Sequence, residues 1–277
     1  MLDFCLLFLY HPGMLTSIFG MPKVIIGMVH LLPLPGSPRW AGDLAAVLAR
    51  AREDALALAR GGVHGLIVEN FGDLPFERGR AEPHTVAAMT LAVRAIRDVT
   101  DLPVGVNVLR NDAISALAIA HITGAQFIRV NVLTGAVIAG EGIVEGEPAM
   151  VMRYRRRLGA EVKVFADVLV KHAAPVATLP IEREASDAVE RGLADAVIVT
   201  GPATGEAADM EEIARARAAL PKAPLLVGSG VDDSNVKQAL SLADGVIVGT
   251  SLKRDGVVTN PVDEERVRAL VQLAGLS

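Results

Sequence analysis

Cysteine is almost absent from this chain of 277 residues, which contains Cys5 alone. One cysteine cannot form a disulfide within the chain, and it agrees with a reducing, cytoplasmic location. Aromatic residues are also scarce, at 4%, so Val, Ile, Leu and Ala must fill the core, which suits helices packed on a parallel sheet. Positive charge is in deficit, with a net charge of −5, and this argues against a nucleic-acid-binding protein because such proteins present a basic face.

Long apolar runs are missing as well. The run over residues 4–10 is far shorter than the about 20 residues of a membrane-spanning helix, and Asp3 stands where a signal peptide carries a basic residue. We interpret residues 1–20 as an N-terminal extension, either dispensable or due to a misplaced start codon, since Met21 directly precedes the first predicted strand. A weak membrane-surface anchor is the alternative. Residues 21–277 are predicted to form one domain, because no linker divides them.

Short β-branched runs alternate with longer segments of helical periodicity along the whole of this domain. The runs begin at Val24, Gly65, Pro103, Phe127, Val162, Ala196, Leu225 and Gly245. The helical segments cover residues 43–60, 85–98, 112–121, 148–158, 182–191, 210–220, 234–242 and 262–273. This alternation is typical of parallel βαβ units, and eight of them over roughly 250 residues predict a closed (β/α)8 barrel. No GxGxxG follows the first run, which disfavours an open, doubly wound sheet.

Polar residues recur on one side of four predicted strands. Alternate residues of a barrel strand face the barrel axis, and in these strands the apolar set takes the helix-facing side. The residues left facing inward are Glu69, Asn107, Arg129, Asn131, Lys163 and Asp167. Buried charges need partners, so an ion-pair network is one interpretation, above all for Arg129 and Lys163. The other four lie at carboxyl ends of strands, where barrel enzymes hold their catalytic groups, and we predict catalytic roles for them.

Glycine turns follow the last two predicted strands. They consist of Gly228, Ser229 and Gly230 after the seventh strand, and Gly249, Thr250 and Ser251 after the eighth. Glycine allows backbone N–H groups to approach an anion closely, and the hydroxyl groups add further donors. Because many barrels hold phosphate at these two strand ends, the turns predict a phosphate site. Lys253 either adds positive charge there or is a solvated loop residue.

Several further residues are candidates for chemistry at the same end of the barrel. His30 ends the first strand and is a metal ligand, a general base or a hydrogen-bonded structural histidine. Lys171 and His172 follow the fifth strand, and with Asp167 they could serve acid–base or Schiff-base chemistry. Arg110 is either an anion ligand or a surface residue, and the Thr-Gly pairs at 200–201 and 204–205 could form a second anion site or a lid.

No metal or cofactor site is predicted. The six histidines are scattered, and the sequence contains no HExxH motif. Nothing in the spacing of the acidic residues requires Mg²⁺, although Glu69 and Asp167 are the side chains that would hold it.

Whole phrases of the sequence resemble the BtpA/SgcQ family. They are GMVHLLPLPGSP at Gly27, GGVHGLIVENFGDLPF at Gly61, GVNVLRNDA at Gly105, FIRVNVLTGA at Phe127, RYRRRLGAEVKVFADVLVKHA at Arg153, DAVIVTGPATG at Asp195, VGSGVDDSNV at Val227 and DGVIVGTSLKRDG at Asp244. The resemblance extends from Met21 to about Leu273. It implies a TIM barrel of the ribulose-phosphate-binding type. His64 departs from the aspartate expected in the GGVDG phrase, in a turn.

The resemblance leaves two functions open. Cyanobacterial members of the family are linked to photosystem I biogenesis as peripheral membrane proteins, and other members are described only as predicted TIM-barrel enzymes. The first hypothesis is therefore an enzyme that acts on a phosphorylated sugar or nucleotide-like metabolite, with Glu69 and Asp167 as general acid or base and Asn107 and Asn131 orienting hydroxyl groups. The second is a non-catalytic assembly or stabilisation factor. The expected partners are accordingly a phosphorylated small molecule, with a membrane surface, a protein complex or a second copy of the chain as alternatives, and no nucleic acid.

Overall fold

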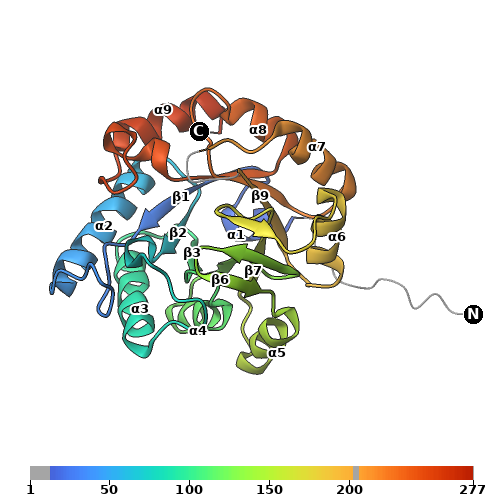
Figure 1. Ribbon diagram of the computed structural model, residues 1–277. Helices are drawn as coiled ribbons and strands as arrows, with labels where there is room; N and C mark the ends of the chain where they lie inside the picture. Colours follow the sequence, from blue (N-terminus) through green and yellow to red (C-terminus); the bar gives the residue numbers. More distant parts are fainter. Residues whose placement is uncertain (1–12, 202–205, 277) are drawn as a thin grey trace, which may run out of the picture.

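The barrel predicted from the sequence is present in the computed structural model, which describes residues 13–201 and 206–276. The strands that close it are β1 (Val24–His30), β2 (Gly65–Glu69), β3 (Val104–Asn107), β4 (Phe127–Val130), β7 (Lys163–Val168), β9 (Ala196–Thr200), β10 (Leu225–Gly228) and β11 (Gly245–Val248). Each pairs in parallel with its neighbours, and β1 pairs with both β2 and β11, so the sheet has no free edge (Figure 1).

Helices surround the barrel and follow the predicted segments closely. They are α2 (Leu44–Gly61), α3 (Pro83–Arg97), α4 (Ala113–Thr123), α5 (Pro148–Leu158), α6 (Ile181–Glu190), α7 (Met210–Ala219), α8 (Val236–Leu242) and α9 (Glu264–Ala274). Their ends follow from local chemistry: the Asp43 carboxylate accepts the Ala46 N–H at the start of α2, and Gly62 ends the helix in a left-handed conformation. Among the described residues, no helix is long and apolar enough to cross a bilayer.

The interior of the barrel has an apolar half and a polar half. At the amino ends of the strands, Phe127 stacks on Phe165 with ring centroids 4.6 Å apart, among inward-facing Ile26, Ile67 and Ile198. At the carboxyl ends the inward positions are polar and buried. The alternation read from the sequence is therefore correct, since Leu66 and Val68 pack against the helices while Ile67 and Glu69 face inward.

Helix α1 (Met14–Phe19) covers the amino-terminal end of the barrel. Met14 and Leu15 are buried against the inner apolar cluster, and the Phe19 ring meets the Phe127 ring edge to face at 5.7 Å. Gly65 makes room for this contact, because a Cβ atom there would lie 2.5 Å from Phe19. Residues 14–19, assigned to an extension from the sequence, are thus packed against the domain, whereas residues 1–12 lie outside the described residues.

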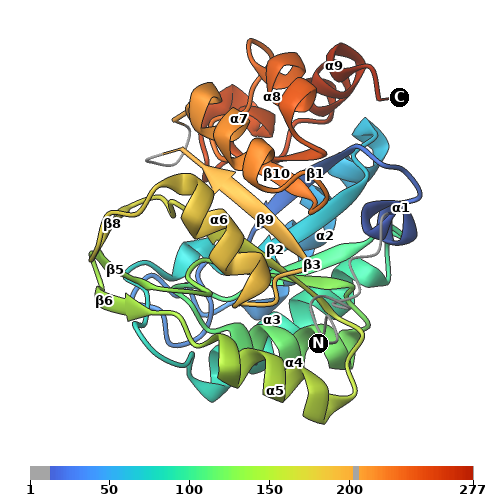
Figure 2. The ribbon, with the colours of Figure 1, turned by 90° about the vertical axis from the view of Figure 1, so that its right-hand side faces the viewer.

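A small antiparallel sheet that the sequence did not lead us to predict projects from the opposite end of the barrel (Figure 2). It is formed by β5 (Ala136–Ala139), β6 (Gly142–Glu145) and β8 (Ala173–Pro175), in the order β6-β5-β8. Val137 and Ala139 pack towards a cluster of Val132, Val144 and Val170 that holds the sheet to the barrel. The loops after β4 and β7 are therefore joined, and both lie at the end of the barrel that carries the polar interior.

Candidate functional site

The two glycine turns meet around one cavity. The cavity measures about 230 Å³ and lies at the carboxyl ends of β1, β10 and β11. Its lining residues are Met28, His30, Arg129, Lys171, Ser229, Gly230, Val231, Asp232, Ile247, Gly249, Thr250 and Ser251. Five of the six residues predicted to hold phosphate are among them. Gly228 is the sixth: it lies beneath the cavity, and a Cβ atom there would be 2.9 Å from Ile198 and 3.7 Å from the Arg129 guanidinium.

The conformation of the first turn explains why its residues are small. Ser229 and Gly230 both have left-handed backbones, with φ of 74° and 62°. A Cβ atom on Gly230 would lie 2.2 Å from the Glu206 backbone, so only glycine fits without a shift of the chain. The Asn235 amide fixes the turn by donating to the Gly230 carbonyl over 2.7 Å while its oxygen accepts the Asp232 N–H.

A hydroxyl group links the two turns. The Ser251 Oγ donates to the Val231 carbonyl over 2.8 Å, which connects the loop after β11 to the loop after β10. Gly249 packs closely against His30, because a Cβ atom at this position would lie 3.2 Å from the imidazole ring. The two turns and their small side chains therefore border a space in which an anion of phosphate size could be bound.

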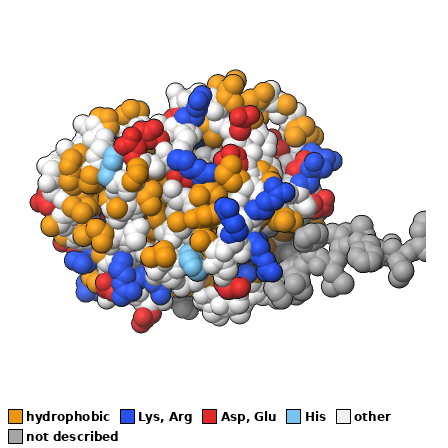
Figure 3. All heavy atoms as spheres, turned by 90° about the horizontal axis from the view of Figure 1, so that it is seen from below, with side chains coloured by type: hydrophobic (Ala, Val, Ile, Leu, Met, Phe, Trp, Pro, Cys, Tyr) orange, Lys and Arg blue, Asp and Glu red, His pale blue; other side chains and the backbone are white. Residues whose placement is uncertain are grey.

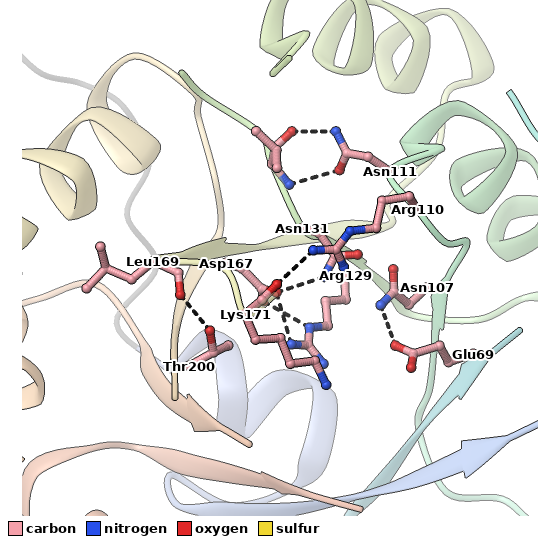
Figure 4. Close-up of polar contacts among 11 residues, drawn as sticks. Glu69, Asn107, Arg110, Asn111, Arg129, Asn131, Asp167, Leu169, Lys171 and Thr200 are labelled. Carbon is pink, nitrogen blue, oxygen red and sulfur yellow. Dashed lines mark hydrogen bonds and ion pairs between the residues drawn. The ribbon is translucent and has the colours of Figure 1, made fainter. Parts of the chain in front are cut away.

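Two cations reach this cavity from the other side of the barrel. The Arg129 guanidinium comes from β4, and the Lys171 ammonium comes from the loop after β7 (Figure 4). That loop is held by hydrogen bonds from Thr200 Oγ1 to the Leu169 carbonyl and from the Arg110 guanidinium to the Lys171 carbonyl, both 2.8 Å long. Leu169 and His172 have left-handed backbones, uncommon for such residues and often found at functional sites.

The Lys171 ammonium differs from the Arg129 guanidinium in its contacts. Within residues 13–201 and 206–276 it makes no hydrogen bond and no ion pair. Burial lowers the pKa of Lys171, and Arg129 and Arg110 lower it further against the opposing charges of Glu69 and Asp167.

Asp167 is committed to a buried ion pair. Its two carboxylate oxygens accept Nε and Nη2 of Arg129, each over 2.9 Å, and the second oxygen also accepts the Asn131 amide over 2.8 Å (Figure 4). The Asp167 side chain is 0% exposed. Burial alone would lower the pKa of Arg129, but Asp167 and Glu69 outweigh it and raise that pKa. The arrangement agrees with the ion-pair interpretation of Arg129 and leaves neither carboxylate oxygen of Asp167 without a hydrogen bond.

Glu69 has a freer carboxylate. One oxygen accepts the Asn107 amide over 2.6 Å, and the other lies 3.9 Å from Nε2 of His30. The His30 ring packs against the Phe71 ring, with centroids 4.7 Å apart and the ring planes tilted by 31°. Burial, followed by the charges of Lys253, Lys171 and Arg129, holds the pKa of His30 well below its ordinary value. His30 is therefore neutral at pH 7 and can accept or donate a hydrogen bond beside Glu69.

Some predicted residues are elsewhere. Lys253 is neither solvated nor directed at the cavity: it is fully buried, and its Nζ donates to Asp54 of α2 over 2.9 Å. Lys163 is half-buried at the start of β7 and forms no ion pair with the inward carboxylates among the residues described. His172 is exposed, while Arg110 is buried and its Nε lies 3.6 Å from Glu141, so the alternative of a surface arginine is wrong.

Other predictions concern features that remain outside this site. The Thr-Gly pair at 204–205 lies outside the described residues. Over the part of the chain that is described, no group of three or more His, Cys, Asp or Glu side chains could hold a metal ion.

A second, larger cavity lies on the far side of Asp167 and Asn131. It measures about 830 Å³ and is bounded by the small sheet and α6. Its lining includes Val137, Leu169, Val176, Leu179, Glu184 and Thr200. Asn131 lines this cavity, and its side-chain oxygen Oδ1 is buried without a hydrogen-bond partner in the described chain.

The sequence did carry a signal for the small sheet: the AVIA and GIVE segments flank a Gly-Glu pair, which is typical of a hairpin.

Asn70 and Asn111 were also missed as site residues. The Asn111 amide bonds both backbone groups of Val132, over 2.8 and 2.9 Å, and so extends β4 towards the cavity. Asn70 accepts the Leu109 N–H over 2.8 Å and donates to Asp73 over 3.0 Å. An asparagine in the loop that follows a strand is their shared signal, although the same residue type also caps helices.

Comparison with known proteins gives the family of this barrel. The BtpA family model matches residues 21–275. The chain belongs to the BtpA family. It is 50% identical to the Photosystem I biogenesis protein BtpA of Synechocystis over 93% of this chain and 90% of that protein. It is 49% identical to an uncharacterized protein of Thermococcus kodakarensis, over 91% and 95% of the two chains, and 35% identical to a mitochondrial uncharacterized protein of Caenorhabditis elegans, over 88% and 90%.

Solved structures match the barrel as a fold. N-(5'-phosphoribosyl)anthranilate isomerase from Pyrococcus furiosus superposes with a TM-score of 0.56 at 15% identity, over 92% of this chain and all of that one. The corresponding isomerase from Thermus thermophilus gives 0.56 at 14% identity, over 91% and 98%. At this identity the likeness shows the TIM-barrel architecture and nothing about the ligand.

Proposed function

We propose that this BtpA-family barrel is an enzyme that binds a phosphorylated small molecule, with the phosphate in the cavity between the glycine turns. One observation carries the proposal: the two glycine turns and two cationic side chains, Arg129 and Lys171, line the same cavity of about 230 Å³ from opposite sides. Binding a non-reacting phosphate in this way would position the rest of the molecule over the centre of the barrel. The fold shared with two phosphoribosylanthranilate isomerases is compatible with the proposal.

Glu69 and His30 are the acid–base pair in this proposal. The Oε1 atom of Glu69 lies 3.9 Å from Nε2 of His30, which lines the phosphate cavity, whereas Asp167 is occupied by Arg129 and Asn131. Asn107 orients the Glu69 carboxylate through its 2.6 Å hydrogen bond. The two inward carboxylates thus have different roles in this proposal. Glu69 performs acid–base chemistry, and Asp167 orients Arg129 and Asn131.

The phosphate site can be tested with inorganic phosphate and a panel of phosphorylated metabolites, using the melting temperature and isothermal titration. Removal of the cation in Lys171→Met, or of the hydroxyl in Thr250→Val, should weaken binding by about 10-fold to 100-fold, because a hydrogen bond to a charged group is worth about 1.5–3 kcal/mol. Lys222→Met is the matched control, since Lys222 is exposed and precedes β10 at the other end of the barrel. Equal binding by all four proteins would refute the proposed site.

A second candidate function is a non-catalytic assembly factor for a membrane protein complex such as photosystem I. The name of the Synechocystis relative and the exposure of Ile138, Ile143 and Val176 on the small sheet, at 54%, 54% and 57%, favour it. Elsewhere the surface is mixed: the face on which α5 lies carries grouped basic side chains and scattered apolar ones (Figure 3). Ile138→Ser with Ile143→Ser should abolish partner binding under this hypothesis, while Glu69→Gln should leave it intact.

A further inference from the structure

Lys171 stands apart from the other groups that surround the phosphate cavity, and the following inference rests on the proposed phosphate site. The Arg129 guanidinium is occupied by a bidentate ion pair with Asp167. The Lys171 ammonium lines the same cavity without a hydrogen bond or ion pair in the described chain. The Lys171 side chain is half-buried, so its nitrogen is open to the cavity and can contact a molecule bound there. Its availability therefore points to chemistry in addition to charge.

The loop after β7 fixes the position of this amine from two sides. Arg110, itself buried, donates to the Lys171 carbonyl, and Thr200 donates to the Leu169 carbonyl two residues earlier, both over 2.8 Å. The side chain of Lys171 then runs alongside Arg129 into the centre of the barrel, as Figure 4 shows. A lysine in a mobile surface loop would have neither constraint.

The surroundings of Lys171 favour its neutral form more than water does. An amine attacks a carbonyl group only when it is deprotonated, and lysines are activated for this by burial or by neighbouring cations. Burial and the two arginines, Arg129 and Arg110, act in this direction, whereas Glu69 and Asp167 oppose it. Glu69, with His30 at 3.9 Å, is close enough to influence the charge of Lys171 and provides a route for the protons that the reaction moves.

We propose that the Lys171 amine forms an imine with the carbonyl group of a phosphorylated aldehyde or ketone whose phosphate occupies the glycine turns. The neutral amine attacks the carbonyl carbon, so that a C–N bond forms and the oxygen takes up the proton released by nitrogen. A second proton, supplied through Glu69 and His30, allows that oxygen to leave as water, and the C=N bond forms as a protonated imine. The nitrogen then returns its remaining proton to the same pair, which leaves the neutral imine. The balance is one amine and one carbonyl compound giving one imine and one water, with no oxidation or reduction.

Reductive trapping tests the proposal on the full-length protein. Glycolaldehyde phosphate, which is small enough for the cavity, is added with sodium cyanoborohydride, and peptide mass mapping locates the reduced adduct. The expected result is a single adduct at Lys171. It should form at least about tenfold faster than with glycolaldehyde, since one charge-assisted hydrogen bond to the phosphate corresponds to roughly that factor, and excess inorganic phosphate should suppress it.

Two variants distinguish this proposal from the phosphate site on which it rests. Lys171→Arg retains the positive charge and should still be stabilised by inorganic phosphate, but it should give no adduct. Lys222→Arg should behave as the wild-type protein does. If the adducts are spread over surface lysines, and the same lysines are labelled in Lys171→Arg, the proposed imine is wrong. If phosphate stabilises wild-type protein and Lys171→Arg while no Lys171 adduct forms, the imine is wrong and the phosphate site stands. If phosphate neither stabilises the wild-type protein nor suppresses labelling, both are wrong.

Discussion

Replacement of Asp167 by asparagine separates its structural role from a catalytic one. The carboxylate accepts three hydrogen bonds, two from Arg129 and one from Asn131, and an amide cannot accept all three because one of its heavy atoms is a donor. The change also leaves the Arg129 charge uncompensated at a position that is only 3% exposed. Breaking a buried ion pair in this way costs about 3–5 kcal/mol, which is a large share of the about 5–15 kcal/mol that stabilises a typical domain.

The measurement is urea unfolding followed by circular dichroism, with the m-value checked for constancy. Asp98→Asn is the control, because Asp98 pairs with Arg94 on the exposed surface of α3, where an ion pair is worth at most about 1 kcal/mol. Arg129→Met combined with Asp167→Leu should recover much of the loss, since neither charge is then buried alone. If Asp167→Asn lowers the free energy of unfolding by less than about 1 kcal/mol, the carboxylate is not the essential counter-ion of Arg129, and a catalytic role for Asp167 regains support.

Three further predictions concern parts of the barrel around this pair. Leu15→Ala should lower the free energy of unfolding by about 2–5 kcal/mol, as for other buried leucines. Replacement of its exposed neighbour in Thr16→Ala should change this free energy by less than about 0.5 kcal/mol. Similar values for both variants would show that α1 does not contribute to the core. Lys253→Met should reduce thermal stability and also weaken phosphate binding, because Lys253 anchors the loop after β11 to Asp54; unaltered binding in a folded variant would separate the anchor from the site. Because the pKa of His30 is lowered in the folded protein, below pH 6.5 the unfolded chain binds a proton that the folded chain does not. The free energy of unfolding should therefore fall as the pH decreases from 6.5, and it should fall less steeply in His30→Asn. Equal slopes for the two proteins from pH 6.5 to 5 would contradict a neutral, buried His30.

The barrel could be predicted from the sequence because its signals are local. The alternation of Leu66, Ile67, Val68 and Glu69 determines which side of β2 faces inward, and the same period recurs in the other strands. The glycine turns were predictable for a related reason: once the strand order is known, the loops after the last two strands must be neighbours. These predictions need only the period of the sequence and the rules of barrel topology.

The direction of long, flexible side chains could not be predicted in the same way. Lys171 and Lys253 each follow a barrel strand or its turn, yet one reaches the cavity and the other reaches Asp54 of α2. The choice depends on partners that are distant in sequence, such as Arg110 and Thr200 for the Lys171 loop. Long-range contacts of this kind leave no periodic trace in the chain.

Helix α1 was assigned to an extension for a similar reason. Its six residues are too few to show a helical period, and they belong to the first twenty residues, which do not resemble the rest of the chain. Only the open amino-terminal end of the barrel, which is a product of the complete fold, shows what Met14, Leu15 and Phe19 cover.

The aromatic layer beneath the polar half determines at which end of the barrel small molecules would enter and leave. Phe19, Phe127 and Phe165 lie in contact one after another at the amino-terminal end of the barrel, and with the buried Ile26, Ile67 and Ile198 they fill its interior there. The carboxyl-terminal end carries both the glycine turns and the small sheet, so a compound bound beside Lys171 would enter and leave at that end. Substrate entry and product release would then use the same end of the barrel. A product that is slow to dissociate would therefore delay binding of the next substrate molecule.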